Sequence, residues 1–409
     1  MRADVLIAGG GPAGAALAIL AGRAGLSVAL FESHHFPRDK PCGEGLMPAG
    51  VGALARLGVD AAHAGSRFAG IRYHGFGLVA EARFPAPARA IADGGPAPHG
   101  LGQRRTVLDQ ALLAVARATP HVQVHEDAPV DGVVWRAGRV TGLRIGDRAI
   151  GGRLVVGADG ARSVVRHALG LDGARARRPR WGARMHFRLA AGRAVPDVVE
   201  IFVGDDHELY LTPLPDGEVL VAMLTAHARA HGPGPAPEQR SDHLPNDERA
   251  PGNERATLLE LVARHPILAD RLQGATPVSR LMGRSPLAAR ASAGFVPGAV
   301  LIGDAAGFTD PITGGGMAQA LLSAELLAAR LPRILAEGDT EQLWRFDRSR
   351  RVMLRDYLLL TRAMVGIARR PFLARAMLRA MRAKPKVMRH LVGVAAGLRR
   401  LVPGPRPEA

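Results

Sequence analysis

The sequence predicts a fold that combines an α/β part with an α+β part, and three of its features carry this prediction. A short apolar strand opens the chain and runs into a Gly-x-Gly-x-x-Gly pattern at residues 9–14. Two further apolar segments, 154–156 and 299–302, end in Gly-Ala-Asp and Gly-Asp. Between them, four segments typical of antiparallel strands occur at 185–189, 198–203, 208–211 and 219–224. The three apolar strands would complete one Rossmann-like sheet, with the antiparallel sheet inserted into it.

The glycine pattern has the spacing of a nucleotide cradle. Gly9 permits a tight turn, Gly11 leaves room for a pyrophosphate beside the backbone, and Gly14 lets the next helix pack closely on the strand. The expected helix at 15–24 then presents its N-terminal N–H groups to an anion. Glu32 follows 18 residues after Gly14, where a carboxylate can accept both ribose hydroxyls of adenosine and would repel a 2′-phosphate. The spacing predicts a site for the ADP part of a dinucleotide other than NADP.

A membrane-spanning segment is the alternative interpretation of residues 5–31, because this stretch is long and almost uncharged. Six glycines, a proline and Arg23 interrupt it. No basic flank followed by a cleavage site accompanies it either. The dinucleotide interpretation is therefore preferred.

Composition restricts the class of protein further. The 409 residues suffice for two or more hydrophobic cores, and an apolar content of 47% is ordinary for a globular chain. Cys42 is the only cysteine, so no intramolecular disulfide can form and a cytoplasmic location is expected. None of the 15 histidines has metal-ligand spacing to another ligand. No metal is therefore expected.

Positive charge is concentrated near the C-terminus. The net charge is +17, and residues 341–409 hold 17 Lys and Arg against four acidic residues, a local net charge of +13. Leu360, Met364, Leu378 and Met388 recur there at helical intervals, which predicts a basic amphipathic helical tail. Either this tail packs on the body with a solvated arginine face, or it binds an anionic membrane surface, a phosphorylated substrate or an acidic carrier protein. Nucleic acid is not expected as a partner, because no binding module accompanies the charge.

Two carboxylates follow the later apolar strands. Asp159 stands in Gly-Ala-Asp-Gly after the strand at 154–156, and Asp304 stands in Gly-Asp-Ala-Ala-Gly after the strand at 299–302. Both therefore lie where open α/β sheets bind ligands, at the carboxyl ends of buried strands. Each motif alone is a common turn, but their order behind the glycine cradle makes the combination specific.

With these motifs the chain resembles the group A flavoprotein monooxygenase superfamily, whose parent fold is that of p-hydroxybenzoate hydroxylase. Within it the chain is most similar to the geranylgeranyl-reductase branch. The resemblance covers nearly all of residues 1–335 and implies a glutathione-reductase-type FAD-binding domain, with Asp304 bonded to the ribityl chain. The residues that it assigns to FAD binding are Gly9, Gly11, Pro12, Ala13, Gly14, Glu32, Ser33, Arg38, Cys42, Gly43, Arg105, Asp159, Gly160, Asp304, Pro311, Gly314, Gly315, Gly316 and Met317.

Two glycine-rich segments indicate the reductase branch. Residues 36–46, which include Cys42 and Gly43, are similar to the Cys-Gly loop that these enzymes lay against the flavin ring. Residues 310–317 read Asp-Pro-Ile-Thr-Gly-Gly-Gly-Met and are similar to their Asp-Pro-x-Thr-Gly-x-Gly segment. Glycines at this place expose backbone N–H groups at the start of a helix, where they stabilise negative charge on reduced flavin.

The substrate motif departs from the pattern of that branch. The reductases carry Tyr-x-Trp-x-Phe-Pro, whereas this chain has Tyr210, Thr212 and Leu214 before Pro215. The smaller side chains disfavour a prenyl diphosphate and leave room for a different or bulkier lipophilic molecule. The Trp-x-Trp-x-Ile-Pro segment of flavin halogenases is absent.

Three residues are candidates for catalysis by their position in these segments: Cys42, Tyr210 and His186. Tyr210 and His186 fall on expected strands of the antiparallel sheet and would face a pocket. For Cys42 the alternative is a small packing residue in a Gly-Pro loop, since only Arg38 and Lys40 lie near it in the sequence to lower its pKa.

The expected domains are discontinuous in sequence. The FAD-binding domain takes residues 1–75, 100–178 and 282–335, the substrate domain takes 76–99 and 179–281, and the basic helical region takes 336–409. A long polar loop is expected at 227–253.

The expected activity is that of an FAD-dependent oxidoreductase acting on a hydrophobic isoprenoid, quinone-like or polyketide substrate, by hydride transfer to an alkene. One alternative is an NAD(P)H-dependent monooxygenase that hydroxylates an aromatic or polyketide ring, and another is a non-catalytic flavin-binding interaction protein. No second glycine-rich cradle is visible, which matches a superfamily in which NAD(P)H docks transiently. NAD(P)H is therefore the expected transient electron donor, and a ferredoxin-like protein is the alternative. Association of the tail with a membrane stays open beside the cytoplasmic location.

Overall fold

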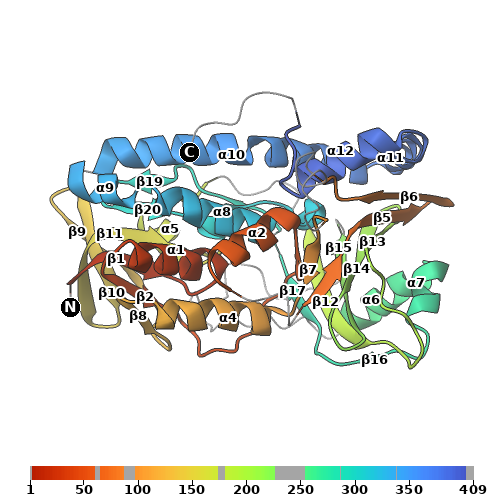
Figure 1. Ribbon diagram of the computed structural model, residues 1–409, viewed down its shortest axis with the longest axis horizontal. Coiled ribbons are helices and arrows are strands. Elements are labelled where there is room, and N and C mark those ends of the chain that lie inside the picture. Colours follow the sequence, from red (N-terminus) through yellow and green to blue (C-terminus); the bar gives the residue numbers. More distant parts are fainter. Residues whose placement is uncertain are drawn as a thin grey trace, which may run out of the picture.

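The computed structural model describes residues 2–59, 65–86, 97–173, 180–225, 254–285, 287–337 and 339–401. Two eight-stranded sheets lie next to each other along the long axis of the molecule (Figure 1). The long helix α10 (Asp339–Ala368) runs over the first sheet, and α11 (Pro371–Ala383) and α12 (Pro385–Ala395) lie over the second (Figure 1). The predicted loop at 227–253 is outside the described residues.

The first sheet contains the three predicted apolar strands at its centre. The order of its main path is β19-β20-β11-β1-β2-β8, and β1 pairs in parallel with both β11 and β2. The strands β9 and β10 extend it as an antiparallel pair that joins β11. The strands are β1 (Arg2–Ala8), β2 (Val28–Phe31), β8 (Val122–His125), β9 (Gly132–Arg136), β10 (Arg139–Ile145), β11 (Arg148–Gly157), β19 (Phe295–Val296) and β20 (Ala299–Leu301).

Helices cover one face of this sheet, and the side chains that alternate along β1 divide between two cores. Val5 and Ile7 pack with α1 and α8, whereas Leu6 packs with residues of β10 and α5 on the other face. The helices of the first sheet are α1 (Pro12–Arg23), α2 (Pro48–Arg56), α4 (Arg105–Ala118), α5 (Val164–Ala168) and α8 (Gly316–Ala328). Short 3₁₀ helices follow β20 and precede α8, namely η3 (Gly303–Ala306) and η4 (Pro311–Thr313).

The second sheet confirms the predicted antiparallel insert. Its order is β16-β12-β15-β14-β13-β5-β6, with β17 on β12, and only the β13–β5 pair of this path is parallel. The strands are β5 (Gly70–Gly75), β6 (Leu78–Arg83), β12 (Trp181–Arg188), β13 (Val199–Val203), β14 (His207–Pro213), β15 (Glu218–Thr225), β16 (Thr276–Pro277) and β17 (Met282–Arg284). Its outer face packs against α6 (Glu254–Ala263) and α7 (Pro266–Arg271).

Two small sheets connect these parts. Strand β7 (Gly100–Gly102) pairs with β3 (Gly45–Leu46) and β4 (Ser66–Phe68), and β18 (Ala289–Arg290) pairs with β21 (Gly307–Phe308). The segment around Cys42 therefore runs into a strand that is anchored to both halves of the molecule.

The C-terminal region is helical and packs on the body through its apolar residues. It consists of α9 (Leu331–Glu337), α10 (Asp339–Ala368), α11 (Pro371–Ala383) and α12 (Pro385–Ala395). Leu378, Met381 and Met388 are buried, and α11 and α12 lie on β6 (Figure 1). No helix in the described parts of the chain combines the length and apolar character needed to cross a lipid bilayer.

Two details differ from the sequence prediction. Alternating residues at 122–124, 130–136 and 140–145 predict one antiparallel meander, but β8 pairs in parallel with β2, and the meander is β9-β10-β11. Strand β5 pairs with β13 in the second sheet, so the expected boundary of the FAD-binding segment at residue 75 lies too late by one strand. Both errors concern which strands become neighbours, and local alternation does not encode this.

Candidate active site

The glycine cradle has the geometry that its spacing predicts. Gly9 has φ +99°, a conformation that favours glycine, and a Cβ there would stand 2.5 Å from the Ala158 carbonyl oxygen. A Cβ at Gly14 would collide with the carbonyl oxygen of Gly9, so α1 packs directly on the turn. At Gly11 a Cβ would meet only Arg38 Nη2, at 3.5 Å. The backbone at Gly11 is therefore open on the side where a pyrophosphate would approach.

Glu32 follows β2 and is held close to the cradle. Its Oε2 accepts a hydrogen bond of 2.8 Å from the Gly10 N–H, and Oε1 accepts one from the Ser33 hydroxyl. Burial opposes ionisation of Glu32, but the Arg38 guanidinium and the Gly10 N–H outweigh it and lower the pKa of this carboxyl. An ionised carboxylate is thus fixed where the ribose of an adenosine would lie.

Arg105, expected to contact a flavin nucleotide, is anchored at the start of α4. Its Nε and Nη2 donate hydrogen bonds of 2.7 and 2.6 Å to Asp109, one turn further along the helix. Asp109 is fully buried and also accepts a bond of 3.1 Å from Arg38 Nη1. One buried carboxylate therefore positions two arginines, and it was missed in the sequence although it lies four residues after Arg105.

The two predicted carboxylates occupy the carboxyl ends of neighbouring strands. Asp159 follows β11 and accepts hydrogen bonds from the Ser163 hydroxyl and the Val165 N–H, while Asp304 lies in η3 after β20. Burial raises the pKa of both carboxyls, and for Asp304 the charges of Arg284, Arg105 and Lys40 oppose that rise.

Gly160 and Gly303 allow close approaches beside these carboxylates. Gly160 has φ +85°, and a Cβ there would stand 3.9 Å from Lys40 Nζ. Gly303 has φ +57°, and a Cβ there would stand 2.9 Å from Ala13 Cβ, at the N-terminus of α1 beside Pro12. The ends of β1, β11 and β20 therefore meet at one edge of the sheet.

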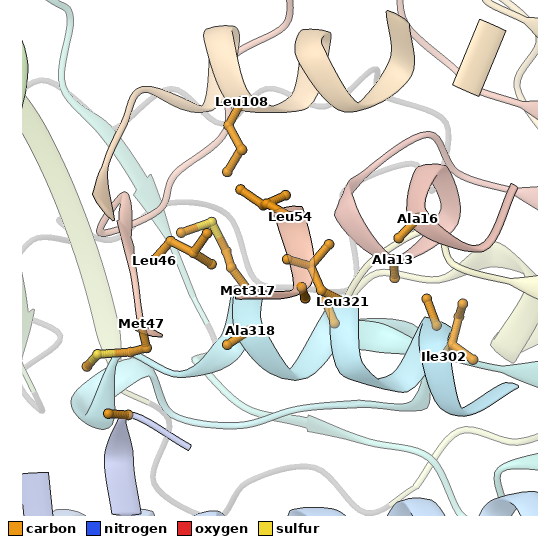
Figure 2. Close-up of a cluster of buried hydrophobic side chains, with 14 of the residues drawn as sticks. Ala13, Ala16, Leu46, Met47, Leu54, Leu108, Ile302, Met317, Ala318 and Leu321 are labelled. Atoms are coloured by element: carbon orange, nitrogen blue, oxygen red, sulfur yellow. The ribbon is translucent and has the colours of Figure 1, made fainter. Parts of the chain in front are cut away.

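The segment 310–317 lies against the segment that follows Cys42. Gly314 has φ +68°, and a Cβ there would stand 3.2 Å from Met47 Cε. Helix α8 begins at Gly316, directly after Pro311–Thr313 and the two glycines. Figure 2 shows Met317 beside Leu46 in the core under this loop. Met317 therefore fixes the loop through its side chain. The Gly314 N–H donates to the Pro311 carbonyl, so an anion site at this helix start would be formed by the N–H groups that follow Gly315.

Glu44 joins the Cys42 loop to both sheets. It has φ +55°, its Oε1 accepts the Arg105 N–H at 3.0 Å, and its Oε2 lies 2.8 Å from His186 Nε2 on β12. The other ring nitrogen of His186 lies 2.8 Å from Ser279 Oγ. Both Glu44 and His186 are buried. His186, predicted as a pocket residue, therefore holds the loop through a partner that the sequence analysis did not assign to the site.

Cys42 lies in the same loop, and Gly43 leaves it uncrowded. Its Sγ accepts a weak hydrogen bond of 3.4 Å from the Glu44 N–H. Burial raises the pKa of the Cys42 thiol, although the Arg105 guanidinium opposes this. Arg105, which is distant in sequence, is thus the cation that most lowers the pKa of Cys42. Its effect is too small to produce an activated thiolate.

A second buried charged group joins the second sheet to the 310–317 loop. Arg180, just before β12, bonds to Glu208 on β14 and lies 3.1 Å from Asp310 Oδ1. Burial raises the pKa of Glu208 to about 7 and also raises that of Asp310, with Arg180 opposing both shifts. Close by, the Tyr210 hydroxyl donates a 3.2 Å hydrogen bond to the Ile312 carbonyl, and burial raises its pKa.

The strands of the second sheet carry a row of paired residues across the sheet. Arg184 pairs with Ala222, Ala222 with Tyr210, Tyr210 with Ile201, and Ile201 with Tyr73. Between Tyr73 and Arg184 this face is mostly apolar. Thr212 is buried on the same face, and its Cγ2 would stand 3.6 Å from a Cβ at Gly45. Thr212, which stands where the reductase motif has tryptophan, thus lies directly against the Cys42 loop.

The structure brings the glycine cradle, Asp159 and Asp304 to one edge of the first sheet, and the Cys42 and 310–317 loops join this part to the second sheet through His186 and Tyr210. A glycine cradle, an ionised carboxylate for ribose and two half-buried strand-end carboxyls are the features of a dinucleotide-binding site, and the glycine loop at α8 fits the electron-rich edge of a flavin. These features together define a flavin-dependent oxidoreductase. The chain belongs to the family described as FAD binding domain, which matches residues 2–358.

Relatives in this family include reductases and monooxygenases. The menaquinone reductase of Mycobacterium tuberculosis (strain ATCC 25618 / H37Rv) is 31% identical over 384 residues, which cover 88% of this chain and 84% of that protein. The protoasukamycin 4-monooxygenase of Streptomyces nodosus subsp. asukaensis is 29% identical, with coverage of 86% and 84%. A geranylgeranyl bacteriochlorophyll reductase-like structure from Thermoplasma acidophilum aligns with a TM-score of 0.74 at 20% identity, over 93% of this chain and 91% of that one. The protein is an FAD-dependent oxidoreductase.

Proposed function

We propose that this oxidoreductase reduces a carbon–carbon double bond of a hydrophobic isoprenoid substrate, an isoprenoid quinone being the leading candidate. The observation that carries the proposal is the contact between the two reductase-type glycine loops and the second sheet. His186 lies 2.8 Å from Glu44 of one loop, and Tyr210 donates to Ile312 of the other. The name of the menaquinone reductase relative supports the substrate class.

The residues of this chain divide the work between holding FAD and enclosing substrate. Gly9, Gly11 and Glu32 would hold the ADP part, and Asp304 the ribityl chain. Bound FAD supplies a hydride for one alkene carbon, while a proton reaches the other carbon and NAD(P)H provides the two electrons as the external reductant. The N–H groups at the start of α8 would favour negative charge on a flavin bound there.

We place the substrate between the loops and the inner face of the second sheet. Leu220 and Ala222 are apolar residues of that face, and Thr212 is smaller than the tryptophan of the reductase pattern. These apolar residues would keep water away from the substrate alkene. Without water nearby, the hydride would be transferred to the substrate and not lost to solvent. Tyr210 is a polar residue of the same face and orients substrate or the flavin loop through its hydroxyl.

Cys42 has a positioning role in this proposal. Its half-buried thiol has a raised pKa and stays protonated near neutral pH, so it acts by shape and weak hydrogen bonding at the loop and not as a nucleophile.

A monooxygenase that hydroxylates an aromatic or polyketide ring is the second candidate. The protoasukamycin 4-monooxygenase relative favours it, with coverage almost as high as that of the menaquinone reductase. Both candidates use the same FAD site and the same external reductant. They differ in the group that is transferred to the substrate, which is a hydride in the reductase and an oxygen atom in the monooxygenase.

Single-turnover product analysis separates the two. The purified holoenzyme is reduced with NADPH or NADH and mixed with an isoprenoid quinone in detergent, once without oxygen and once with it, and the products are measured by mass spectrometry. A product that still carries two added hydrogen atoms in its isoprenoid chain after any quinol has been reoxidised in air supports the reductase, because reoxidation reverses reduction of the ring but not of an alkene. A product that has gained an oxygen atom, and only in the aerobic sample, contradicts it and supports the monooxygenase. FAD that neither nicotinamide reduces at a useful rate would contradict both.

A further inference from the structure

Helix α11 carries a stripe of exposed positive charge that begins with an exposed aromatic residue. Phe372, Arg375, Arg379 and Arg382 follow one another at intervals of three, four and three residues, which places them on one side of a helix. All four are exposed, and Phe372 is 69% exposed. Among the large hydrophobic side chains of the described residues, Phe372 is the most exposed, and it stands at the head of a row of cations.

The stripe is mounted rigidly on the body. Ala374, Leu378 and Met381, on another side of α11, are buried in the main core together with Tyr73 and Ala80 of the second sheet. Figure 1 shows α11 and α12 lying over β5 and β6. A fixed helix with one packed side and one exposed cationic side presents its charges in a defined plane.

Helix α12 follows α11 directly and carries further exposed cations. Lys384 at its N-cap and Lys386, Val387 and Arg389 in its first turns are exposed, with Val387 at 50%. Residues 371–389 contain six Lys and Arg and no acidic residue. We call the exposed side chains of Phe372, Arg375, Arg379, Arg382, Lys384, Lys386, Val387 and Arg389 the α11–α12 surface.

The cations of this surface differ from those of α10. On α10, Arg345 pairs with Glu341, Arg351 with Asp347 and Arg355 with Asp356. Within the described part of the chain, no ion pair is found for the six cations of the α11–α12 surface. Six like charges held together without counter-charges repel one another, and an anionic partner would relieve that cost.

We propose that the α11–α12 surface docks the protein on an anionic lipid bilayer, with Phe372 and Val387 entering the headgroup region. The cations are attracted to anionic lipid. Phe372 and Val387 among them can bury apolar surface in the bilayer interface, which strengthens binding. An acidic protein would satisfy the cations but offers no evident reason for an isolated exposed phenylalanine. The expected tail–membrane contact is thereby narrowed from residues 341–409 to residues 372–389.

The test is sedimentation of the full-length holoenzyme with phosphatidylcholine vesicles that contain or lack phosphatidylglycerol. Binding should occur only with phosphatidylglycerol and should weaken as salt rises. Each cation near an anionic bilayer contributes about a fivefold factor to binding, so the triple variant R375Q/R379Q/R382Q should bind about 100-fold more weakly. Phe372→Ser should weaken binding to the same vesicles without changing its salt dependence. All four side chains are exposed, so folding is not at risk, and bound FAD absorbance verifies it.

The matched control removes the same net charge elsewhere. Arg136, Arg148 and Arg264 are exposed side chains on β9, on β11 and after α6, and their triple substitution by Gln should reduce binding much less. Equal losses in the two triple variants would show attraction by overall charge and would overturn the proposal. Absence of binding to phosphatidylglycerol vesicles, with or without binding to an acidic protein, would overturn it as well. Turnover of a detergent-solubilised substrate does not depend on this surface, so failure here is distinct from failure of the proposed reaction.

Discussion

His186 Nε2 on β12 lies 2.8 Å from Glu44 Oε2, and the same carboxylate accepts the N–H of Arg105 at the start of α4. Glu44 and His186 are separated by 142 positions in the chain and are both buried. One side chain therefore fixes the relative positions of the Cys42 loop, the second sheet and the helix that bears Arg105. The proposed cofactor and substrate sites share this anchor.

Replacement of Glu44 should destabilise the protein and weaken cofactor binding together. Glu44→Ala leaves two buried groups, the His186 ring and the Arg105 N–H, without their acceptor, which costs about 3 kcal/mol or more. Glu44→Gln keeps one acceptor and should cost about 1–2 kcal/mol. Urea denaturation and FAD titration by fluorescence measure the two effects. The control is Glu325→Gln, whose partner Arg56 is exposed, with an expected loss below about 1 kcal/mol. Equal losses for Glu44→Gln and Glu325→Gln would contradict the anchoring role.

The cradle makes a prediction that separates binding from folding. Gly11 has φ −70° and ψ −177°, which alanine adopts readily, and its Cβ would have space in the protein. Gly11→Ala should therefore leave the stability of the cofactor-free protein unchanged within about 0.5 kcal/mol. FAD affinity should fall by at least about tenfold, because the methyl group occupies the approach of the pyrophosphate.

Gly366→Ala is the matched control for this change. A Cβ at Gly366 on α10 meets nothing within 4 Å, so the variant should bind FAD normally and gain about 0.5–1 kcal/mol from helix propensity. Isothermal titration and thermal unfolding give both quantities. Unchanged FAD affinity in Gly11→Ala would contradict the assignment of the cradle.

Alkylation reports on Cys42 directly, because it is the only cysteine. Burial raises the pKa of its thiol, so the thiolate fraction at neutral pH is small and iodoacetamide should react slowly. The rate should climb with pH without reaching a plateau below pH 9, and added FAD should slow it further. A fast reaction that levels off near neutral pH would instead identify an activated thiolate. Cys42→Ser should retain FAD binding and substrate reduction.

Features that depend on residues close together in the chain could be predicted from the sequence, and contacts between distant segments could not. The cradle from Gly9 to Gly14 and the strand alternation are encoded within a few residues, and both are confirmed. The acceptor of His186 lies 142 positions away, and the pairing of Arg180 with Glu208 and Asp310 joins three separate segments. Hydrophobic periodicity contains no information on such partners. Asp109 is the exception, since its helical spacing from Arg105 was visible in the sequence.

Glu208 should make the stability of the protein depend on pH in a way that one substitution removes. Burial raises its pKa from 4.5 to about 7, despite Arg180. Because the folded state holds this proton more tightly than the unfolded state, the contribution of Glu208 is complete below pH 4.5 and is lost as pH rises through 7. The full change is up to about 3 kcal/mol.

Glu208→Gln stays neutral at every pH, so the difference in unfolding free energy between the parent protein and this variant should fall steadily over that interval. Urea denaturation at several pH values measures this difference, in which other groups cancel, such as His265 with its lowered pKa of about 4. Parallel stability curves for the two proteins would mean that Glu208 is already ionised beside Arg180 throughout the interval.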